Sequence, residues 1–206
     1  METTEKAGIL GGTFNPVHAG HLILAQTALE TLDLTKVVFV PCSRPPHKAP
    51  RSMAEAKHRL AMTQKAVECD PRFEVSDVEI ARGGVSYSID TVREFRKRAP
   101  GTGLVFIIGT DTLAELHLWK DVYELLKLCE LAAFERPGSG PERVSEEDIG
   151  LDPPYGRRLL EGVYPGRKIE ISSSDIRYRA AEGLSIRYLV PETVEMYIAE
   201  HRLYGT

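Results

Sequence analysis

The amino-acid sequence predicts an α/β fold built on a doubly wound parallel sheet, and three observations lead to that class. Short apolar runs typical of buried strands alternate with amphipathic helical segments along almost the whole chain. The composition, with 42% hydrophobic and 27% charged residues, is that of an ordinary globular protein. The 206 residues are enough for one domain with a proper core. We therefore predict a single domain over residues 1–206, in which residues 172–206 form a small C-terminal helical segment.

The first half of the chain alternates between strand and helix patterns. An apolar run at Ala7–Gly11 ends in a glycine pair and predicts a buried strand, and apolar residues recur at helical spacing over His21–Leu32. Lys36–Pro41 predicts a second buried strand. Ser43–Pro50 contains three prolines, which exclude regular structure and predict a loop. The remaining features of this half are a helix at Ala54–Cys69, a short strand at Phe73–Val75 and a break at Gly83-Gly84.

The second half continues the same alternation. Ser88–Arg98 returns to helical spacing, and Leu104–Ile108 is the most strand-like run in the chain. Residues 137–154 are rich in Gly, Pro, Ser and acidic residues, so we expect a long surface excursion there. Short helices are expected at Leu113–His117 and Val122–Leu128, strands at Leu131–Glu135 and Lys168–Ile171, and final helices at Ser174–Glu182 and Glu192–His201. This order of elements predicts a Rossmann-like fold with helices on both faces of the sheet.

Charge and cysteine content exclude several classes of protein. The formal net charge is -4, whereas proteins that follow a nucleic-acid backbone carry a basic face, so any nucleotide bound here is expected to be a small molecule. Cys42, Cys69 and Cys129 are far apart and odd in number, which argues against a disulfide framework and favours reduced thiols in the cytoplasm. No signal peptide is visible, and no apolar stretch approaches the ~20 residues of a membrane helix.

The turn after the first predicted strand combines glycines and histidines. In doubly wound sheets, ligands bind beyond the carboxyl ends of the strands, and Gly11 and Gly12 lie at such an end, where backbone can approach a ligand closely. His18 and His21 follow near the expected start of a helix, whose free N–H groups favour an anion. Neither the G-x-G-x-x-G fingerprint nor a P-loop is present. Two imidazoles in this place can donate hydrogen bonds to phosphate oxygens.

Two other interpretations of these histidines are open. In one, His18 caps the turn and His21 packs against the sheet, as single histidines commonly do. In the other, the His-x-x-His pair shares a metal ion. No third cysteine, histidine or carboxylate lies at ligand spacing, so we expect no metal-binding side chains here. The position between a glycine pair and a helix favours phosphate binding.

A second pattern of the same kind occurs at Ile171-Ser-Ser-Ser-Asp-Ile-Arg177. Serines before a helix are ordinary N-caps, and Asp175 in the first turn suits the helix dipole. We place Arg177 in the first turn as well, where a cation opposes the dipole at a cost of a few tenths of a kcal/mol, up to ~1. An anion shared by Arg177, the serine hydroxyls and the free N–H groups would make this position favourable. The pattern therefore indicates a polyphosphate site.

Together these motifs resemble the bacterial nicotinate-nucleotide adenylyltransferases, which belong to the nucleotidyltransferase superfamily marked by H-x-G-H. The resemblance covers nearly the whole chain and rests on Gly11–His21, Ile171–Arg177, Pro45–Lys48, Ser86–Thr91, Ile108–Asp111, Trp119 and Ile186–Pro191. Three residues depart from the family pattern. Asn15 occupies a position where the family commonly has Asp, Ser174 one where it usually has Thr, and Ser88 one where Thr is frequent. Each keeps a small polar side chain, so none of the roles is removed.

The resemblance implies a reaction. Members of the family join ATP and nicotinate mononucleotide to give nicotinate adenine dinucleotide and pyrophosphate, with Mg²⁺, in NAD biosynthesis. The phosphate of the mononucleotide attacks the α-phosphorus of ATP directly, so catalysis consists of positioning and stabilisation of charge. The resemblance assigns catalytic roles to His18, His21 and Arg177, with His21 bearing most on the α-phosphate.

The resemblance also assigns binding residues. Lys48, Ser88 and Trp119 are expected to bind nicotinate mononucleotide. For three residues another interpretation stays open: Lys48 as a solvated loop lysine, Asp111 as a residue just before a capping box at Thr112–Glu115, and Trp119 as a core residue. The expected ATP-binding residues are Gly11, Gly12, Thr13, Phe14, His18, His21, Gly109, Asp111, Ser172, Ser173 and Arg177.

Several rival functions can be weighed against this one. The nearest are sister enzymes that transfer an adenylyl group to nicotinamide mononucleotide or to another small phosphate acceptor. A non-catalytic nucleotide-binding module is a second rival, but it would not need both histidines and a dipole-opposing arginine. An aminoacyl-tRNA synthetase is excluded because the chain is too short and too acidic for tRNA recognition. We expect ATP and nicotinate mononucleotide as partners, with no nucleic acid and no membrane, and a homo-oligomer is compatible with the sequence.

Overall fold

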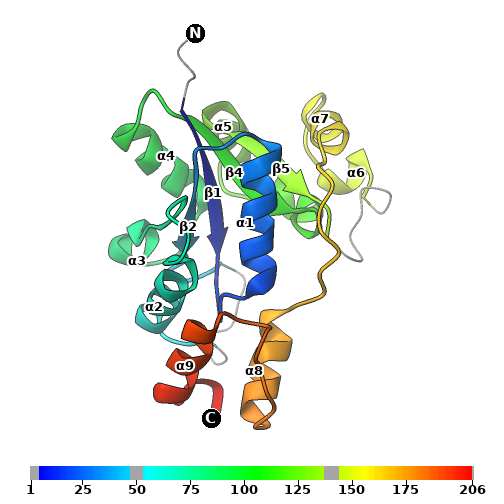
Figure 1. Cartoon of the computed structure of the whole chain (residues 1–206). Helices are drawn as coiled ribbons and strands as arrows, with labels where there is room; N and C mark the ends of the chain where they lie inside the picture. Colours follow the sequence, from blue (N-terminus) through cyan, green and yellow to red (C-terminus); the bar gives the residue numbers. More distant parts are fainter. Residues whose placement is uncertain (1–4, 47–52, 137–143, 206) are drawn as a thin grey trace.

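The computed structural model describes residues 5–46, 53–136 and 144–205 (Figure 1). Its centre is a parallel sheet with the strand order β3-β2-β1-β4-β5. From β1 the chain adds β2 and β3 on one side, then returns to place β4 and β5 on the other, which confirms the predicted doubly wound α/β fold. The strands are β1 (Lys6–Gly12), β2 (Lys36–Pro41), β3 (Phe73–Val75), β4 (Gly103–Gly109) and β5 (Glu130–Phe134).

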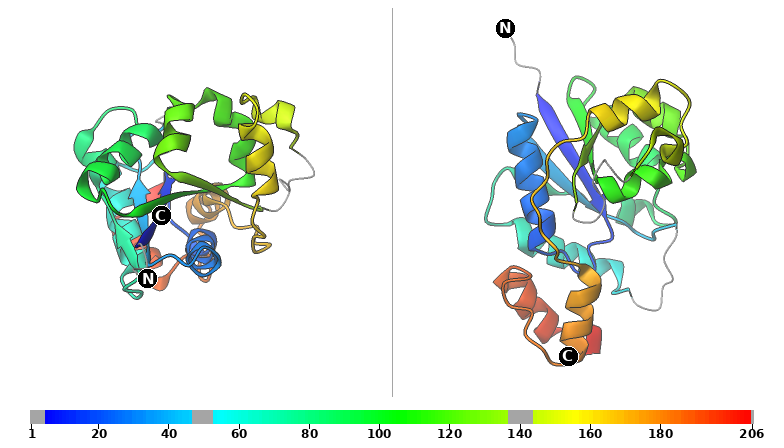
Figure 2. Two further views of the ribbon diagram at one scale, coloured as in Figure 1. Left: turned by 90° about the horizontal axis from the view of Figure 1, so that it is seen from above. Right: turned by 90° about the vertical axis from the view of Figure 1, so that its right-hand side faces the viewer.

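Helices cover both faces of this sheet, as Figure 2 shows. One buried apolar cluster joins the sheet to α1 (Ala19–Thr31), α2 (Ala56–Val67), α8 (Ser173–Ala181) and α9 (Glu192–Glu200). On the opposite face a second cluster includes side chains from α3 (Val78–Arg82), α4 (Ser88–Arg98), η2 (Thr110–Leu118), α5 (Val122–Leu128), α6 (Glu146–Ile149) and α7 (Tyr155–Glu161). The 3₁₀ turn η4 (Leu203–Gly205) follows α9.

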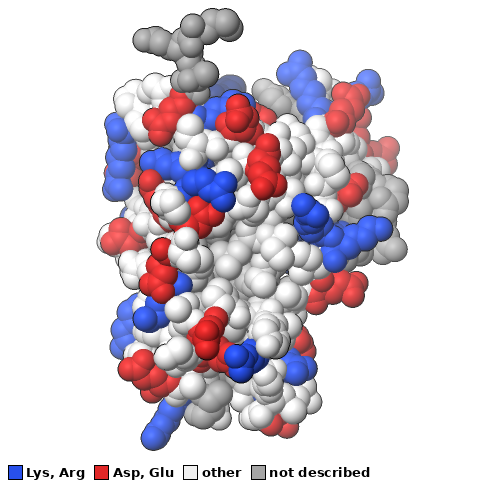
Figure 3. Space-filling model, viewed as in Figure 1, with Lys and Arg blue, Asp and Glu red and all other residues white. Residues whose placement is uncertain are grey.

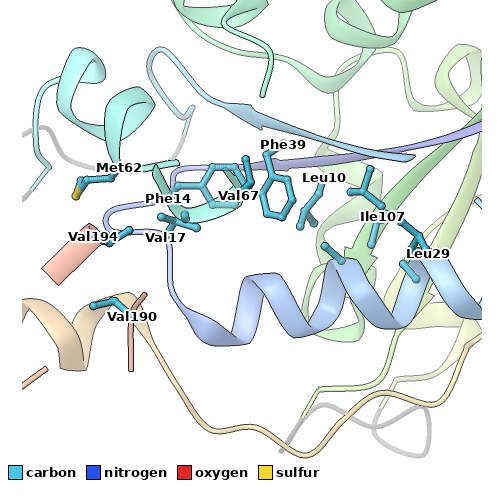
Figure 4. Close-up of a cluster of buried hydrophobic side chains, with 14 of the residues drawn as sticks. Leu10, Phe14, Val17, Leu29, Phe39, Met62, Val67, Ile107, Val190 and Val194 are labelled. Atoms are coloured by element: carbon cyan, nitrogen blue, oxygen red, sulfur yellow. The ribbon is translucent and has the colours of Figure 1, made fainter. Parts of the chain in front are cut away.

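The central strands are apolar throughout because both of their faces are buried. Successive residues point to opposite sides of the sheet. Leu10 therefore belongs to the cluster that contains α1 (the α1 cluster), and Ile9 belongs to the cluster that contains α4. The same alternation holds in β4, where Ile107 faces α1 and Phe106 faces the other layer. Figure 4 shows Phe14 and Val17, just beyond β1, near Val190 and Val194 of the C-terminal segment.

One predicted strand is wrong. Residues Lys168–Ile171 are not in the sheet but form part of an extended connection that runs beside α1 towards α8 (Figure 1). The chain pairs with the end of β5 only at Tyr164, whose N–H donates to Ala133 O at 2.8 Å. Ile171 then packs against the α1 cluster. The apolar alternation of this segment thus buries one side against a helix layer, a pattern that a strand would also produce.

Some helices also differ from expectation. Leu113–His117 belongs to the 3₁₀ helix η2, whose N-cap is Gly109 without a side-chain cap bond, so the capping box expected at Thr112–Glu115 does not form. The sequence patterns did not predict α3, α6 or α7, because segments of four to seven residues show a helical period only where their few apolar residues fall at the right spacing, as they do in α5. Helix α6 lies within the expected excursion 137–154, of which residues 137–143 lie outside the described ranges, as do residues 47–50 of the expected proline loop.

Two observations bear on whether the chain spans a membrane or follows a nucleic-acid backbone. Within the described ranges, no helix combines the length and the apolar character needed to cross a membrane. Basic and acidic side chains are interspersed among the described residues of the face in Figure 3, without a continuous basic stripe. That face therefore offers no basic path for a nucleic-acid backbone.

Candidate functional site

Three adjoining cavities lie around the carboxyl ends of the strands. The central cavity, of about 270 Å³, opens where β1 and β4 end, at the point where the strand order reverses. An outer cavity of about 470 Å³ shares Pro46, Ser86, Ser88 and Trp119 with it. A slot of about 60 Å³ between α1 and residues 166–171 shares His21, Leu24 and Arg136 with it. The central cavity also contacts Gly11, Gly12, Thr13, Cys42, Glu79, Gly109 and Asp111.

The Gly–His turn (residues 11–21) forms one wall of the central cavity. A Cβ at Gly12 would lie 2.9 Å from the ring of Phe14, so this position requires glycine. Phe14 has a left-handed φ of 46°, and its side chain is buried in the core with its ring edge-on to His21 at 5.0 Å. Phe14 lines none of these three cavities, contrary to its expected place among the ATP-binding residues, and its ring supports His21.

The two histidines of the turn lie together, as the sequence predicts. Their rings stack with centroids 3.7 Å apart at the start of α1, and the His18 backbone N–H donates to His21 Nδ1 at 3.2 Å. Because His21 Nδ1 accepts this bond, a neutral His21 carries its proton on Nε2. His21 lines both the central cavity and the slot. The ring that carries the Nε2–H donor therefore faces the cavities in which a ligand would bind.

His18 is almost completely buried, with 2% of its surface exposed. Its Nδ1 has no hydrogen-bond partner among the described residues. Burial, assisted by the nearby positive charge of Arg136, lowers the pKa of His18 from 6.5 to about 4, so the ring is neutral at pH 7.

The start of α1 offers fewer free backbone donors than expected, because Ala19 N–H donates to Leu189 O at 2.9 Å and His21 N–H donates to His18 O.

The Ser–Arg turn (residues 171–177) contacts the Gly–His turn directly. Ser172 is the N-cap of α8 and accepts from Asp175 N–H at 3.1 Å, as the N-cap interpretation predicts. The Ser173 hydroxyl donates to Pro16 O at 2.9 Å, and Arg177 Nη1 donates to Asn15 O at 2.8 Å. Arg177 is the fifth residue of α8, because the helix begins one residue earlier than predicted, and it therefore lies just beyond the first turn. Its charge is therefore placed by the turn it binds rather than by the dipole of the first turn.

Asp111 lies at the other wall of the central cavity, just after β4. Its carboxylate pairs with Arg136 Nη1 at 3.0 Å, and Arg136 N–H donates to Thr110 Oγ1 at 3.1 Å. A Cβ at Gly109 would meet Asp111 at 2.3 Å and Arg136 at 2.4 Å, so glycine allows the pair to lie across the strand end. Sequence reasoning missed Arg136. It follows the last strand of the sheet, and the rule that ligands bind beyond strand ends could have found it.

The outer cavity combines an aromatic wall with a helix start. Ser88 is the first residue of α4, and Asp90 N–H in the same turn already donates to Tyr87 O at 3.1 Å, so the N–H groups of the first two helical residues are the candidate donors to a ligand. The Trp119 ring packs edge-on against Phe106 at 5.9 Å, as the core interpretation predicts, and it also lines the cavity, so the ligand interpretation stays a prediction. Lys120 lies over the Tyr87 ring at 4.8 Å. Lys48, expected to bind the mononucleotide, lies outside the described residues.

Arg59 is a further residue that the sequence did not reveal. Its side chain is completely buried, and its guanidinium donates to the carbonyls of Thr13 at 2.9 Å, Ser43 at 2.8 Å and Ala54 at 3.0 Å. It also donates to Cys42 O at 2.6 Å. A buried cation bound by four carbonyls ties the Gly–His turn to the neighbouring strand end. In the sequence it is one of several arginines on a helix, and no local pattern marks it.

The geometry favours binding of polyanions. The His21 ring, the Arg136 guanidinium and the backbone of Gly11–Thr13 line the central cavity together with the carboxylates of Glu79 and Asp111, and the outer cavity with its aromatic wall adjoins it. In the part of the chain that the structure describes, no group of three or more His, Cys, Asp or Glu is arranged to hold a metal ion. The arrangement is suited to hold two phosphorylated molecules with their phosphates facing each other.

Comparisons with known proteins identify the family to which this chain is similar. The cytidylyltransferase-like family model matches residues 9–179. A probable nicotinate-nucleotide adenylyltransferase of Thermoanaerobacter sp. (strain X514) is 44% identical over 205 residues, covering 99% of this chain and 96% of that protein. A probable nicotinate-nucleotide adenylyltransferase of Opitutus terrae is 45% identical over 199 residues, covering 97% of each chain.

Solved structures share the fold. The Plasmodium falciparum nicotinic acid mononucleotide adenylyltransferase complexed with NaAD aligns with a TM-score of 0.76, at 18% identity and 97% coverage of both chains. A second structure of that protein, complexed with APC, aligns with a TM-score of 0.74. At this level of identity the likeness shows the fold alone.

Proposed function

The chain belongs to the nicotinate-nucleotide adenylyltransferases of the cytidylyltransferase-like family, and from this premise we propose how its site performs adenylyl transfer. The enzyme transfers the adenylyl group of ATP to nicotinate mononucleotide, giving nicotinate adenine dinucleotide and pyrophosphate, in NAD biosynthesis. The observation that supports the site most is the stacked pair His18–His21, placed beside the central cavity at the reversal of the strand order.

The phosphates of ATP bind along the Gly–His turn in this proposal. The His21 Nε2–H donates to the α-phosphate, and backbone groups of Gly11–Thr13 line the nucleotide. His18, Ser172 and Arg177 contribute to the β- and γ-phosphates. Ser173 contributes its backbone N–H, because its hydroxyl already donates to Pro16 O.

The adenosine part of ATP enters the slot beside α1. Ile23, Leu24 and Ile169 give the slot apolar walls that suit a base. Asp111 and Gly109 lie where the slot and the central cavity adjoin, so we assign Asp111 to the ribose hydroxyls. Arg136 is bonded to Asp111 and lines both spaces, and we add it to the ATP-binding residues.

Nicotinate mononucleotide occupies the central and outer cavities. The pyridine ring lies against Trp119, and its carboxylate accepts hydrogen bonds from the N–H groups of the first two residues of α4 and from the Ser88 hydroxyl. We retain the proposal that Lys48 binds phosphate. Donors around this carboxylate favour the acid over the amide, because a carboxamide would bring a second donor to the same place.

Mg²⁺ enters as its complex with ATP. The donors near the phosphates are imidazoles, guanidinium groups and amides rather than the oxygen ligands that Mg²⁺ prefers. These residues fit a cation that is held mainly by phosphate oxygens and water. When bound, Mg²⁺ neutralises charge on the phosphates.

The reaction itself needs no protein nucleophile. The phosphate oxygen of the mononucleotide forms a bond to the α-phosphorus, and the bond from that phosphorus to the bridging oxygen of pyrophosphate breaks. His21 donates to an oxygen whose charge grows in the transition state, while the two turns hold the departing pyrophosphate. The residues of this chain therefore act by position and charge.

The test measures pyrophosphate release by the purified full chain with Mg·ATP and a panel of acceptors. We expect kcat/KM for nicotinate mononucleotide to exceed that for nicotinamide mononucleotide on the order of a hundredfold, as two unmatched donors would produce. Equal use of acid and amide would favour the sister enzyme. Release with neither acceptor, although ATP binds, would leave the nucleotide-binding module as the better description.

A further inference from the structure

The last turn of the chain returns to the Gly–His turn. Tyr204, in η4, donates its hydroxyl proton to Asn15 Oδ1 at 2.8 Å, across 189 residues of sequence. Tyr204 has a left-handed φ of 66°, which is uncommon for an aromatic residue. The hydrogen bond to Asn15 links the last turn of the chain to the Gly–His turn.

Asn15 is the point where several segments meet. It is buried, with 5% of its surface exposed. Its Oδ1 accepts from Ala54 N–H at 3.1 Å as well as from Tyr204, and its backbone O accepts from Arg177 Nη1 at 2.8 Å. Asn15 thus joins the Gly–His turn to the start of α2, to α8 and to the C-terminus.

The side chain of Tyr204 is partly buried beside the Gly–His turn. Burial raises the pKa of Tyr204 well above its usual range, and Arg177 and Arg59 lie near enough to oppose that rise. The same C-terminal segment also binds the turn through Leu189 O, which accepts from Ala19 N–H at 2.9 Å. Two separate contacts from residues 189–204 therefore hold the beginning and the end of the Asn15–Ala19 stretch.

We propose that Tyr204 is a positioning residue for the ATP side of the site: through Asn15 it holds the Gly–His turn and the guanidinium of Arg177 in the geometry that receives the phosphates. This inference rests on the proposed function for its assignment to ATP. The C-terminal segment then contributes to substrate binding without touching substrate. The outer cavity, built from Ser88 and Trp119, is independent of this contact.

The test compares Tyr204→Phe with Tyr188→Phe in the full chain. Tyr188 lies in the same segment and has the same φ of 66°, but it is 84% exposed, so its variant controls for the loss of a tyrosine hydroxyl. ATP affinity is measured by calorimetry without any acceptor, and KM values for both substrates are measured by pyrophosphate release. The calorimetric arm does not depend on which acceptor the enzyme uses.

We expect Tyr204→Phe to weaken ATP binding roughly tenfold, the scale on which small misplacements of positioned groups act, and to leave KM for the mononucleotide unchanged. Tyr188→Phe should match the wild type. A merely structural role would lower the folded fraction without changing either constant. An ATP affinity within twofold of wild type, or an equal loss for both substrates, would overturn the proposal.

Asn15 variants test the same contact from the other side if Tyr204→Phe folds poorly. Asn15→Asp keeps an oxygen acceptor for Tyr204 and Ala54, so ATP affinity should stay near wild type. Asn15→Ala removes the acceptor and should weaken ATP binding as Tyr204→Phe does. In the Asn15→Ala background, Tyr204→Phe should have no further effect, since the hydroxyl would have lost its partner. Additive losses would contradict a role exerted through Asn15.

Discussion

The hydrogen bond from the His18 backbone to His21 Nδ1 sets what each histidine can do. It leaves His21 with an N–H donor at Nε2, and it makes the orientation of the ring depend on the turn. His18 is buried and neutral, with its ring stacked on His21 at 3.7 Å. At the scale of single residues, the proposal therefore gives His21 the Nε2–H donor to the α-phosphate, while His18 stacks on the His21 ring and contributes to the β- and γ-phosphates.

Replacement of His21 by Asn separates these functions. The Asn amide oxygen can stand where Nδ1 accepts from His18 N–H, while the donor at Nε2 is lost. We expect kcat for pyrophosphate release to fall by a factor on the order of 10²–10³, as for the loss of one transition-state donor, with a much smaller change in ATP affinity. His201→Ala is a control on an exposed histidine. A kcat within a few-fold of wild type would return His21 to a packing role.

The lowered pKa of His18 predicts a dependence of stability on pH. The unfolded chain binds this proton with a pKa near 6.5 and the folded chain with a pKa of about 4, so the unfolded state binds more protons between these values. The free energy of unfolding therefore falls as the pH is lowered from 6.5 to 4, by about 3 kcal/mol from this group.

Urea denaturation of wild type and His18→Asn across that range measures the effect. The other ionisable groups contribute equally to the wild type and to His18→Asn, so the difference in unfolding free energy between the two proteins isolates His18. The advantage of the wild type should shrink as the pH falls from 6.5 to 4 and stay constant above 7. A difference that does not change with pH would mean that His18 is not buried as a neutral ring.

At the scale of elements, the connection from α7 to α8 shapes the slot beside α1. It passes so close to the end of β5 that a Cβ at Gly166 would lie 2.0 Å from Glu135 O. Tyr164 O accepts from Glu135 N–H at 3.0 Å and fixes the crossing. Close approach of two backbones, rather than a turn, is the reason for glycine at this position.

Gly166→Ala should displace this connection. We expect a loss of about 1–3 kcal/mol in the free energy of unfolding, the usual cost of overpacking, together with weaker ATP binding because Gly166 and Ile169 line the slot. Gly101→Ala is a matched control, since a Cβ there meets nothing within 4 Å. Urea denaturation and calorimetry measure both effects. Wild-type ATP affinity in a destabilised Gly166→Ala protein would contradict the assignment of the slot to adenosine.

At the scale of the whole molecule, one apolar cluster spans the chain from Leu10 to Ile198. It contains side chains of β1 and α1 together with those of α8 and α9, and Figure 4 shows Val190 and Val194 near Phe14 and Val17. The C-terminal segment therefore shares a core with the sheet. We propose that residues 1–206 form one folding unit.

A single unit should unfold in one transition. Trp119 fluorescence reports on the face of the sheet opposite α9, and hydrogen exchange of the α9 amides reports on the C-terminal segment. We expect the same midpoint and the same free energy from both probes in urea, as two-state unfolding requires. An earlier loss of protection in α9 would instead make residues 172–206 a separate, weaker unit.

Much of the fold could be predicted from the sequence, because strand and helix periods are local properties. Lys36–Pro41 and Ser88–Arg98 form elements with the bounds that their patterns predict. The paired histidines were predicted to share one side of a helix start, and they do. The prediction from local pattern failed at Lys168–Ile171. Apolar and polar residues alternate there because one side of the segment packs on a helix layer, and a strand in a sheet shows the same alternation.

The sequence by itself determined the fold class, the family and the position of the two turns proposed to bind phosphate, since each is encoded in the order and spacing of neighbouring residues. Only the tertiary structure decided what joins those turns. Arg177 reaches Asn15 across 162 residues and Tyr204 reaches it across 189, while Arg59 binds carbonyls of three separate segments. Such contacts form because packing of the sheet and both helix layers brings distant backbone within about 3 Å, and no local period records that packing.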